Sequence, residues 1–272
     1  GDVYKRQDID FSEYIYMEVD SSYRGGIDLN GHILNFEKRY SYYSYGIGLR
    51  NESGAGGGLF EITDSNPSVV HEGYVNSENE PLTGGIITGF RYNMNSSAGG
   101  STSCLSINNL NCVLDGVTFF DNTTGGGGSC IDKFGENGTL EINKCKFYDN
   151  KSNYWASCVW VGTSRSDSRN DQCLITDSVF KGNYGKYTST VATSSENCVI
   201  KNCLFENNEC DSGGTVNVSH YGTLEVVDTD ITGNICTSDE EDDSTTAGIC
   251  IDVCGKLVLN GKVNITGNTY NK

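Results

Sequence analysis

The sequence has little proline, little positive charge and no long hydrophobic run. Only two of its 272 residues are Pro, and 19 Lys and Arg stand against 36 Asp and Glu, which gives a formal net charge of -17. A chain this acidic is not expected to bind nucleic acid or to be attracted to anionic lipid. Because no run approaches the about 18 apolar residues of a membrane-spanning helix, we expect no direct membrane insertion.

What the chain does contain is a recurring phrase, in which an aromatic or branched residue and two arbitrary residues precede Asn. The phrase returns at intervals of roughly 25 to 34 residues, a period that is typical of solenoid proteins. Phe opens it at Phe90, Phe119, Phe147, Phe180 and Phe205, which precede Asn93, Asn122, Asn150, Asn183 and Asn208, and Ile opens it before Asn234 and Asn268.

Each repeat also shows the alternation of apolar and polar residues that β-strands produce. The segments 140–142 and 145–147 alternate in this way, and a third signature joins two small residues to a short strand, as in 213–218. The pattern predicts three short strands per repeat and no helix. Pairing each strand with its copy in the next repeat gives an all-β, single-stranded parallel β-helix, and right-handedness follows from the general preference of parallel crossovers.

The recurring Asn has a physical role in such a fold. Asn tolerates the left-handed backbone region better than most residues, and identical amides stacked about 4.8 Å apart can hydrogen-bond into a ladder. The Phe three residues earlier is expected to point inward and to stack in a column of its own. These residues specify the fold and predict no chemistry.

The domain organisation follows from where the repeat is sustained. We assign 1–25 to an N-terminal leader or irregular segment, within which 1–7 is interpreted as artefactual, and 26–272 to the β-helix. Residues 63–83 hold both prolines and several charges, which favours a loop or a longer excursion. The chain is interpreted as a fragment of a longer protein.

Twelve Cys are present, and most are interpreted as buried thiols in inward columns. Cys104, Cys130 and Cys158 occupy one column of three successive repeats. Cys210 and Cys236 each follow the Asn of adjacent repeats by two residues, so this pair is the best disulfide candidate. No Cys spacing is typical of a zinc site.

The search for catalytic chemistry gives only weak candidates. Asp228 and Asp230 share a strand, and the acidic run 239–243 lies in the longest insertion. Both are interpreted as solvated charge, since a glycosidase needs two carboxylates across one scissile bond. The basic pair Arg165 and Arg169 and the lone His220 are interpreted in the same way. We therefore predict no catalytic residue, no metal site and no cofactor.

The paired phrases Gly-Gly-x-apolar and Phe-x-x-Asn resemble the repeats of chlamydial polymorphic membrane proteins over residues 84–268. This resemblance implies a right-handed β-helix that acts as an adhesin-like surface module. The opening segment 27–32, Ile-Asp-Leu-Asn-Gly-His, is also similar to the first turn of pectin-lyase-like proteins. The catalytic motifs of that family find no match in this sequence.

The function expected from these features is that of a cell-surface or secreted, monomeric, adhesin-like structural module without catalysis, which binds a glycan or protein of a host or neighbouring cell. Its candidate ligand-binding residues are Tyr40, Tyr42, Tyr43 and Tyr45, although inward packing explains them equally well. The alternative is a carbohydrate-active enzyme (a polysaccharide lyase or hydrolase) or a glycan-binding module of the pectin-lyase-like type. An enzyme requires a groove with carboxylates and a basic residue, whereas a binding module requires exposed aromatic rings.

Overall fold

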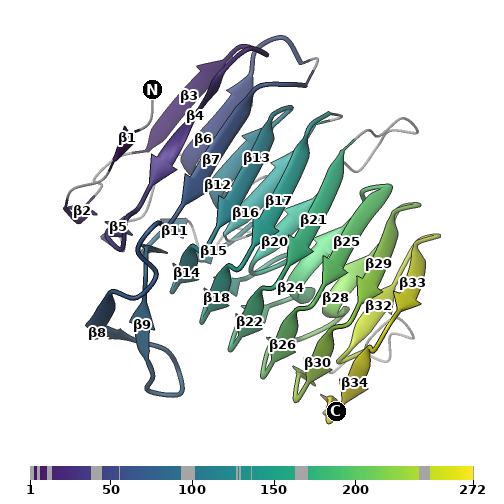
Figure 1. Ribbon diagram of the computed structural model, residues 1–272. Helices are drawn as coiled ribbons and strands as arrows, with labels where there is room; N and C mark the ends of the chain where they lie inside the picture. The colour runs from purple at the N-terminus through teal and green to yellow at the C-terminus, as the bar shows by residue number, and fades with distance from the viewer. Residues whose placement is uncertain are drawn as a thin grey trace.

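The computed structural model describes residues 3–4, 7–10, 14–37, 45–54, 56–92, 102–126, 128, 130–135, 137–162, 171–238 and 246–271. Over these residues the protein is all-β, and no helix occurs among them. Parallel strands build long sheets in which successive strands lie side by side from one end of the molecule to the other (Figure 1). This arrangement is compatible with a parallel β-helix.

The described residues form four such parallel sheets, here named A to D. Sheet A contains β1 (Val3–Tyr4), β4 (Arg24–Asp28), β7 (Leu59–Thr63), β13 (Asn111–Asp115), β17 (Thr139–Asn143), β21 (Gln172–Thr176), β25 (Asn197–Lys201), β29 (Thr223–Val227) and β33 (Lys256–Asn260). Sheet B contains β2 (Ile9–Asp10), β5 (Ile33–Asn35), β10 (Ile86–Thr88), β14 (Thr118–Phe120), β18 (Lys146–Tyr148), β22 (Val179–Lys181), β26 (Leu204–Glu206), β30 (Asp230–Thr232) and β34 (Asn264–Thr266).

The other two sheets complete each repeat. Sheet C contains β3 (Ile15–Val19), β6 (Tyr45–Asn51), β12 (Ser103–Asn108), β16 (Ile131–Phe134), β20 (Val159–Val161), β24 (Thr188–Thr193), β28 (Gly214–Val218) and β32 (Ile249–Ile251). Sheet D contains the two-residue strands β11 (Arg91–Tyr92), β15 (Thr123–Thr124), β19 (Lys151–Ser152), β23 (Tyr184–Gly185), β27 (Glu209–Cys210), β31 (Ile235–Cys236) and β35 (Thr269–Tyr270).

From β12 onward the chain visits the sheets in a constant order, C, A, B and D, and then returns to C beside its previous strand. Each return adds one parallel strand to every sheet, so the sequence period becomes a spatial stack. The alternating pattern predicts strands of sheets A and B, and the small-residue signature predicts strands of sheet C. The short strands of sheet D, directly after each recurring Asn, are not apparent from the sequence.

The recurring Asn side chains form a continuous hydrogen-bonded ladder at the turn between sheets B and D. In each link the side-chain Nδ2 of one Asn donates to Oδ1 of the next, over 2.8 to 3.1 Å. The same Oδ1 also accepts the backbone N–H of the first Asn, and Nδ2 donates a second bond to a carbonyl of the preceding repeat. The ladder runs through Asn122, Asn150, Asn183, Asn208, Asn234 and Asn268.

Four Phe rings stack beside this ladder with nearly parallel planes. The centroid distances are 5.1 Å from Phe119 to Phe147, 4.6 Å from Phe147 to Phe180 and 4.5 Å from Phe180 to Phe205. All four rings are fully buried. The strands of sheet B pair in register, and their side chains alternate between inward and outward. Each ring therefore lies directly over the ring of the previous repeat.

One detail of the turn differs from the sequence prediction. The left-handed residue is not the Asn itself but the residue before it, as at Asp149, where φ is 55°. The ladder position therefore selects Asn for its amide, and the position before it selects Asp, Asn or Gly for the backbone conformation. Asn93 of the first predicted phrase lies outside the described residues.

The phrase that begins at Phe90 does not have the predicted register. Ile87, and not Phe90, is the register partner of Phe119. Phe90 stands instead level with Asn122, and its backbone N–H donates to Asn122 Oδ1 over 3.1 Å. The three-residue spacing to Asn93 thus matches the phrase by chance, while Phe90 fills the interior, where its ring packs edge-on against Phe36.

The segment before residue 26, expected to be a leader or an irregular stretch, contributes three strands to the same sheets. β1 pairs with β4, β2 pairs with β5, and β3 pairs with β6, all in parallel. Regular pairing therefore reaches back to β1. The alternation of apolar and polar residues is weaker in these strands, because large side chains such as that of Tyr16 occupy exposed outward positions.

We expect Asn183→Ala to lower the free energy of unfolding by about 3 kcal/mol, because buried groups that lose their partner cost about 1–3 kcal/mol each. Asn183 is fully buried, and its side chain bonds to Phe147, Asn150 and Asn208. Urea denaturation of the purified protein measures the loss. The control Asn197→Ala removes an exposed Asn and should cost less than about 0.5 kcal/mol. Equal losses in the two variants would contradict a ladder that stabilises the stack.

Candidate functional site

The segment between β7 and β10 leaves the repeating path, and it builds the candidate site. Between β7 and β10 the chain forms an antiparallel hairpin of β8 (Val70–Val75) and β9 (Pro81–Thr83). Its turn is closed by Asn76, whose Oδ1 accepts the backbone N–H groups of Glu78 and Glu80, each over 3.0 Å. The predicted excursion at 63–83 is therefore an ordered element that projects beside the stack (Figure 1).

The hairpin packs on the outward face of sheet B through a small apolar cluster. Leu82 is buried together with Ile33 and Ile86. The Tyr74 ring meets Phe120 edge-on, with 6.4 Å between centroids. Phe120 is exposed to this contact because it alternates with the inward Phe119, so the outward residues of sheet B supply the surface on which the hairpin rests.

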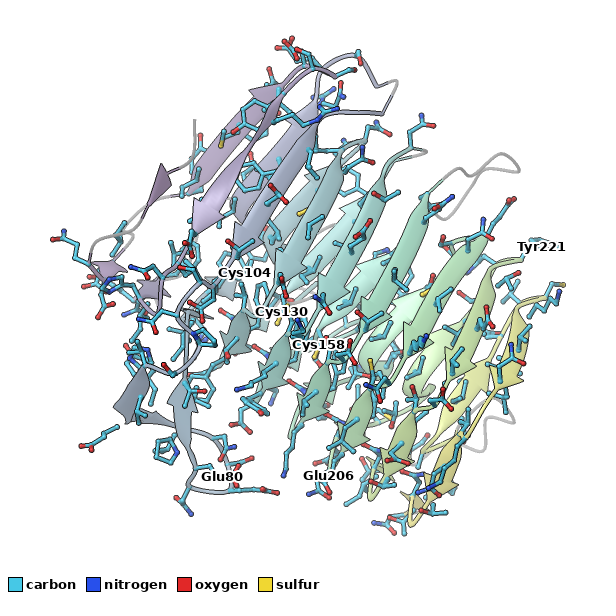
Figure 2. All side chains as sticks on the ribbon, in the orientation of Figure 1. Glu80, Cys104, Cys130, Cys158, Glu206 and Tyr221 are labelled. Carbon is cyan, nitrogen blue, oxygen red and sulfur yellow. The ribbon has the colours of Figure 1, made fainter. Side chains whose placement is uncertain are left out.

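Polar contacts fix the hairpin turn further along the stack. The Ser77 backbone N–H donates to Asp149 Oδ2 over 2.9 Å. Lys181 Nζ lies 2.5 Å from a carboxylate oxygen of Glu78 and 2.9 Å from one of Glu206. Burial disfavours the charge on Lys181, but the hydrogen bonds that its ammonium donates to both carboxylates outweigh this effect and raise the Lys181 pKa. The hairpin turn is thereby tied to three successive repeats; Figure 2 marks Glu80 and Glu206 at this end of the sheet.

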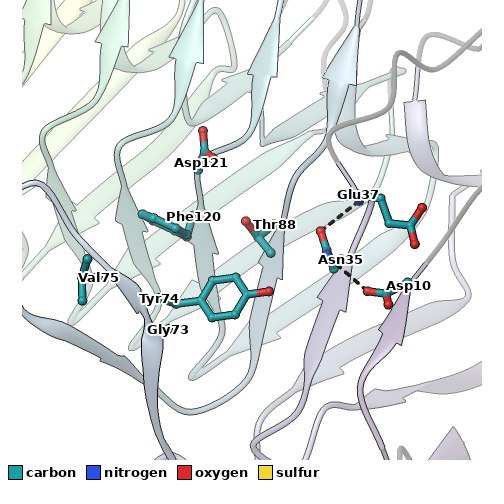
Figure 3. A pocket seen from close by; sticks show the side chains of 9 residues that line it. All are labelled: Asp10, Asn35, Glu37, Gly73, Tyr74, Val75, Thr88, Phe120 and Asp121. Atoms are coloured by element: carbon teal, nitrogen blue, oxygen red, sulfur yellow. Dashed lines mark hydrogen bonds between the residues drawn. The ribbon is translucent and has the colours of Figure 1, made fainter.

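A groove of about 560 Å³ lies between the hairpin and sheet B (Figure 3). Its wall carries the aromatic rings of Tyr74 and Phe120, with carboxylates at both ends. This volume is within the range of small-ligand sites, about 300–1,000 Å³. The lining residues are Asp10, Asn35, Glu37, Gly73, Tyr74, Val75, Thr88, Phe120 and Asp121.

The polar groups of the groove are held in place by short local bonds. Asn35 donates from Nδ2 to Asp10 Oδ1 over 3.1 Å and accepts the Glu37 backbone N–H over 2.9 Å. Asp121 forms an ion pair of 2.7 Å with Arg91. Burial raises the pKa of Tyr74, and the nearby Asp10 adds to the shift, so its hydroxyl stays protonated. The groove thus combines hydroxyl donors, carboxylate acceptors and aromatic faces.

Of the four tyrosines predicted as ligand-binding residues, the structure describes Tyr45, which does not line this groove. Tyr45 begins β6 on sheet C, where its half-buried ring lies 5.6 Å from Tyr14 and 5.8 Å from Tyr16. Tyr40, Tyr42 and Tyr43 lie outside the described residues. The groove residues escaped the sequence prediction because no local motif joins them.

Of the weak catalytic candidates, the structure describes Asp228, Asp230 and His220. Asp228 accepts the Lys262 backbone N–H over 2.8 Å in a turn, and Asp230 points outward from β30. His220 lies 2.9 Å from Ser219 Oγ. Arg165, Arg169 and the acidic run 239–243 fall outside the described residues. Within the described residues, no group of three His, Cys, Asp or Glu side chains could hold a metal ion.

A charged side chain lies in the interior, where the sequence gives no reason to expect it. Lys133 is fully buried on β16, in register with Ile107 and Val161. Its Nζ donates to the Asn137 carbonyl over 3.0 Å. Burial lowers the Lys133 pKa, and the buried Asp171 opposes that shift. This amine replaces an apolar residue of the column and ties the loop after β16 to the interior.

Comparison with protein-family models, with curated proteins and with solved structures finds no match to this chain. Among the described residues, none belongs to a helix long and apolar enough to cross a membrane. The candidate site therefore rests on its geometry.

Eleven of the twelve cysteines are buried, and Cys254 is exposed. Cys104, Cys130 and Cys158 are fully buried and follow one another across sheet C (Figure 2). Cys210 and Cys236 are register partners in sheet D, and both are buried free thiols. In-register neighbours lie about 4.8 Å apart, a separation that a disulfide accepts, so this bridge stays a prediction.

Thiol titration tests this pair. At pH 8 the native protein should react at Cys254, the exposed cysteine, while the other eleven are buried. Burial raises the pKa of thiols such as Cys112 to about 12, so they are not nucleophilic thiolates. After mild oxidation and denaturation, the titre should fall by two thiols from the twelve of the reduced chain, with a cross-linked peptide that contains Cys210 and Cys236. A full titre after oxidation would contradict the bridge.

The contact of the hairpin with Asp149 predicts a pH effect. Burial raises the Asp149 pKa; hydrogen bonds from Ser77 oppose the shift, and the Asp121 and Glu78 carboxylates add to it. Since the folded carboxyl holds its proton more tightly than the unfolded one, ionisation costs stability. This cost is absent below about pH 4, grows as the pH rises through the folded pKa and is complete above it.

We therefore expect Asp149→Asn to be as stable as the parent at pH 7 or more stable, by up to about 1 kcal/mol. Its amide oxygen still accepts the Ser77 N–H, and Asn suits the left-handed φ. Asp149→Ala loses both features and should melt below the parent. Thermal unfolding between pH 4 and 8 measures both variants; a destabilised Asn variant at pH 7 would refute the argument.

Proposed function

We propose that the protein is a right-handed parallel β-helix with about three principal strands per turn that serves as an adhesin-like module of a cell surface or a secreted protein. In this proposal the stack is a rigid support, and the groove beneath the hairpin holds a glycan of a host or neighbouring cell. The right hand accords with the preference of parallel crossovers, and the resemblance to polymorphic membrane protein repeats supports the surface role.

The observation that carries this proposal is the groove beside the antiparallel hairpin of β8 and β9. Binding residues concentrate on segments that depart from a rigid scaffold, and the hairpin between β8 and β9 is such a segment. It is fixed at both ends by the Leu82 cluster and by Lys181, so the groove exists before any ligand arrives. Preformed sites spend little binding energy on ordering.

The chemistry of the groove favours a sugar ligand. Sugar hydroxyls both donate and accept, and they match the side chains of Asp10, Asn35 and Thr88. One face of a pyranose ring carries only C–H groups, which suit the aromatic rings of Tyr74 and Phe120. The volume of about 560 Å³ holds a short oligosaccharide but not a folded partner.

A carbohydrate-active enzyme is the second candidate, because three carboxylates line the same groove. Binding without catalysis is favoured since Asp121 is engaged by Arg91 and Asp10 is bonded to Asn35. A glycosidase needs one carboxyl to donate a proton and the other to attack or to activate water. Here both of these carboxylates already bond to side chains of the protein.

A panel of neutral and acidic soluble polysaccharides separates the two functions. Binding is measured by calorimetry, and release of reducing or unsaturated ends is measured in parallel. We expect saturable binding without release, and at least tenfold weaker binding by Asp10→Asn, a change of charge that keeps the carbonyl acceptor for Asn35. The control Tyr221→Ala alters a residue that is 73% exposed and outside the groove. Release of new reducing or unsaturated ends that Asp10→Asn abolishes would establish the enzyme function instead. Absence of any binding would refute a glycan as the ligand.

A further inference from the structure

A second group of aromatic rings lies on another part of the molecule. Tyr154 and Trp155 follow β19, Trp160 lies in β20, and Tyr187 follows β23. We call these four residues the aromatic platform. The ring centroids lie 5.2 Å apart for Trp155 and Trp160, 5.4 Å for Trp155 and Tyr187, and 5.3 Å for Tyr154 and Tyr187.

The platform differs from the Phe stack in exposure and in geometry. All four of its rings are half-buried, whereas the stacked Phe rings are fully buried. Its rings meet at 36° to 82°, so no ring covers the whole face of its neighbour. The platform contains both Trp of the chain, and Trp160 alternates with the buried Val159 and Val161 on β20.

The regular part of the fold holds these rings in place. The Tyr187 backbone N–H donates to the Tyr154 carbonyl over 2.9 Å, which joins the two turns that carry them. Trp160 is in register with Asp132 and Ala192 on sheet C. Ala156 forms a parallel bridge to Thr188 beneath the turns. The platform is therefore set by two consecutive repeats.

Charge near the platform contrasts with the rest of the chain. Lys186 is exposed, and its Nζ lies 5.5 Å from the Tyr187 ring centroid. Lys151 is also exposed and lies 4.8 Å from the ring centroid of Tyr184. In a chain of net charge -17, Lys186 provides a hydrogen-bond donor beside the Tyr187 ring of the platform, and Lys151 adds positive charge at the neighbouring Tyr184. They favour a ligand rich in oxygen acceptors.

The area of the platform decides which class of ligand fits. A large aromatic side chain offers roughly 150–250 Å² when it is covered completely, so four rings that are each at most about one third exposed leave at most roughly 200–350 Å² open. A standard protein interface needs about 800 Å² on each side. A protein partner or a second copy of the chain therefore finds too little apolar surface, whereas a few sugar rings in a chain cover it.

We propose that the aromatic platform is a stacking site for the pyranose rings of an extended glycan. The C–H face of a pyranose carries a slight positive charge and packs on the negative face of Trp and Tyr. The Lys186 ammonium donates to a hydroxyl of the same glycan, or to a carboxylate if the sugar is acidic. This site lies apart from the groove beneath the hairpin, so each of the two sites can exist without the other.

Tryptophan fluorescence isolates the platform, because no Trp lines the groove and both Trp belong to the platform. The purified chain is titrated with soluble xylan, mannan and β-glucan as neutral glycans and with polygalacturonate and alginate as acidic glycans. We expect a saturable change of Trp emission with at least one glycan. Tyr187→Ala should weaken that response at least tenfold, while circular dichroism and the melting temperature show that the fold persists.

Matched variants separate the two sites and the two kinds of glycan. Tyr221→Ala and the groove variant Tyr74→Ala should leave the Trp titration unchanged. If the bound sugar is acidic, Lys186→Ala should weaken the binding of acidic glycans more than that of neutral ones. If the bound sugar is neutral, the variant should weaken the binding of both slightly. The proposal is overturned if no glycan changes the Trp emission, or if Tyr74→Ala abolishes the response while Tyr187→Ala preserves it.

Discussion

The hydrogen-bonded Asn ladder is the interaction on which the stack depends. Where the chain leaves sheet B it must turn, and the backbone groups inside the turn lose their strand partners. Buried backbone groups need partners, and the Asn amide supplies them, since its Oδ1 accepts a backbone N–H and its Nδ2 donates to a carbonyl. Along the ladder each Asn also bonds to the Asn of the next repeat, so the amide of one turn supplies part of the bonding of its neighbour.

This mutual dependence explains what could be predicted from the sequence. The ladder forces one residue type to return at each turn, and the stacked Phe rings force another three positions earlier, so both appear as a period. The same logic explains the error at Phe90, where a chance spacing to Asn93 imitates the phrase. Only the register with Ile87 and Phe119 distinguishes the imitation from a true repeat.

The candidate sites could not be predicted because their contacts are neither local nor periodic. Tyr74 meets Phe120, and Ser77 meets Asp149, across separations that no sequence window spans. The repeat does reveal that outward positions on sheet B alternate with inward ones. It does not reveal that the hairpin folds back onto those outward positions. That packing depends on the contact of Leu82 with Ile33 and Ile86. The rings of the aromatic platform are dispersed in the same way between two repeats.

Regularity inside and irregularity outside are two consequences of the same constraint. Inward columns and ladder positions must match the neighbouring repeat, whereas outward positions touch solvent and are free to differ. Differences between repeats therefore mark the places where the surface is not specified by stacking. The hairpin breaks the pattern beside sheet B, and the aromatic platform breaks it on sheet C, with large rings where Ala192 occupies the next repeat. Because the stack beneath is rigid, rings and carboxylates at such places keep a fixed geometry without a ligand, which lowers the entropy cost of binding.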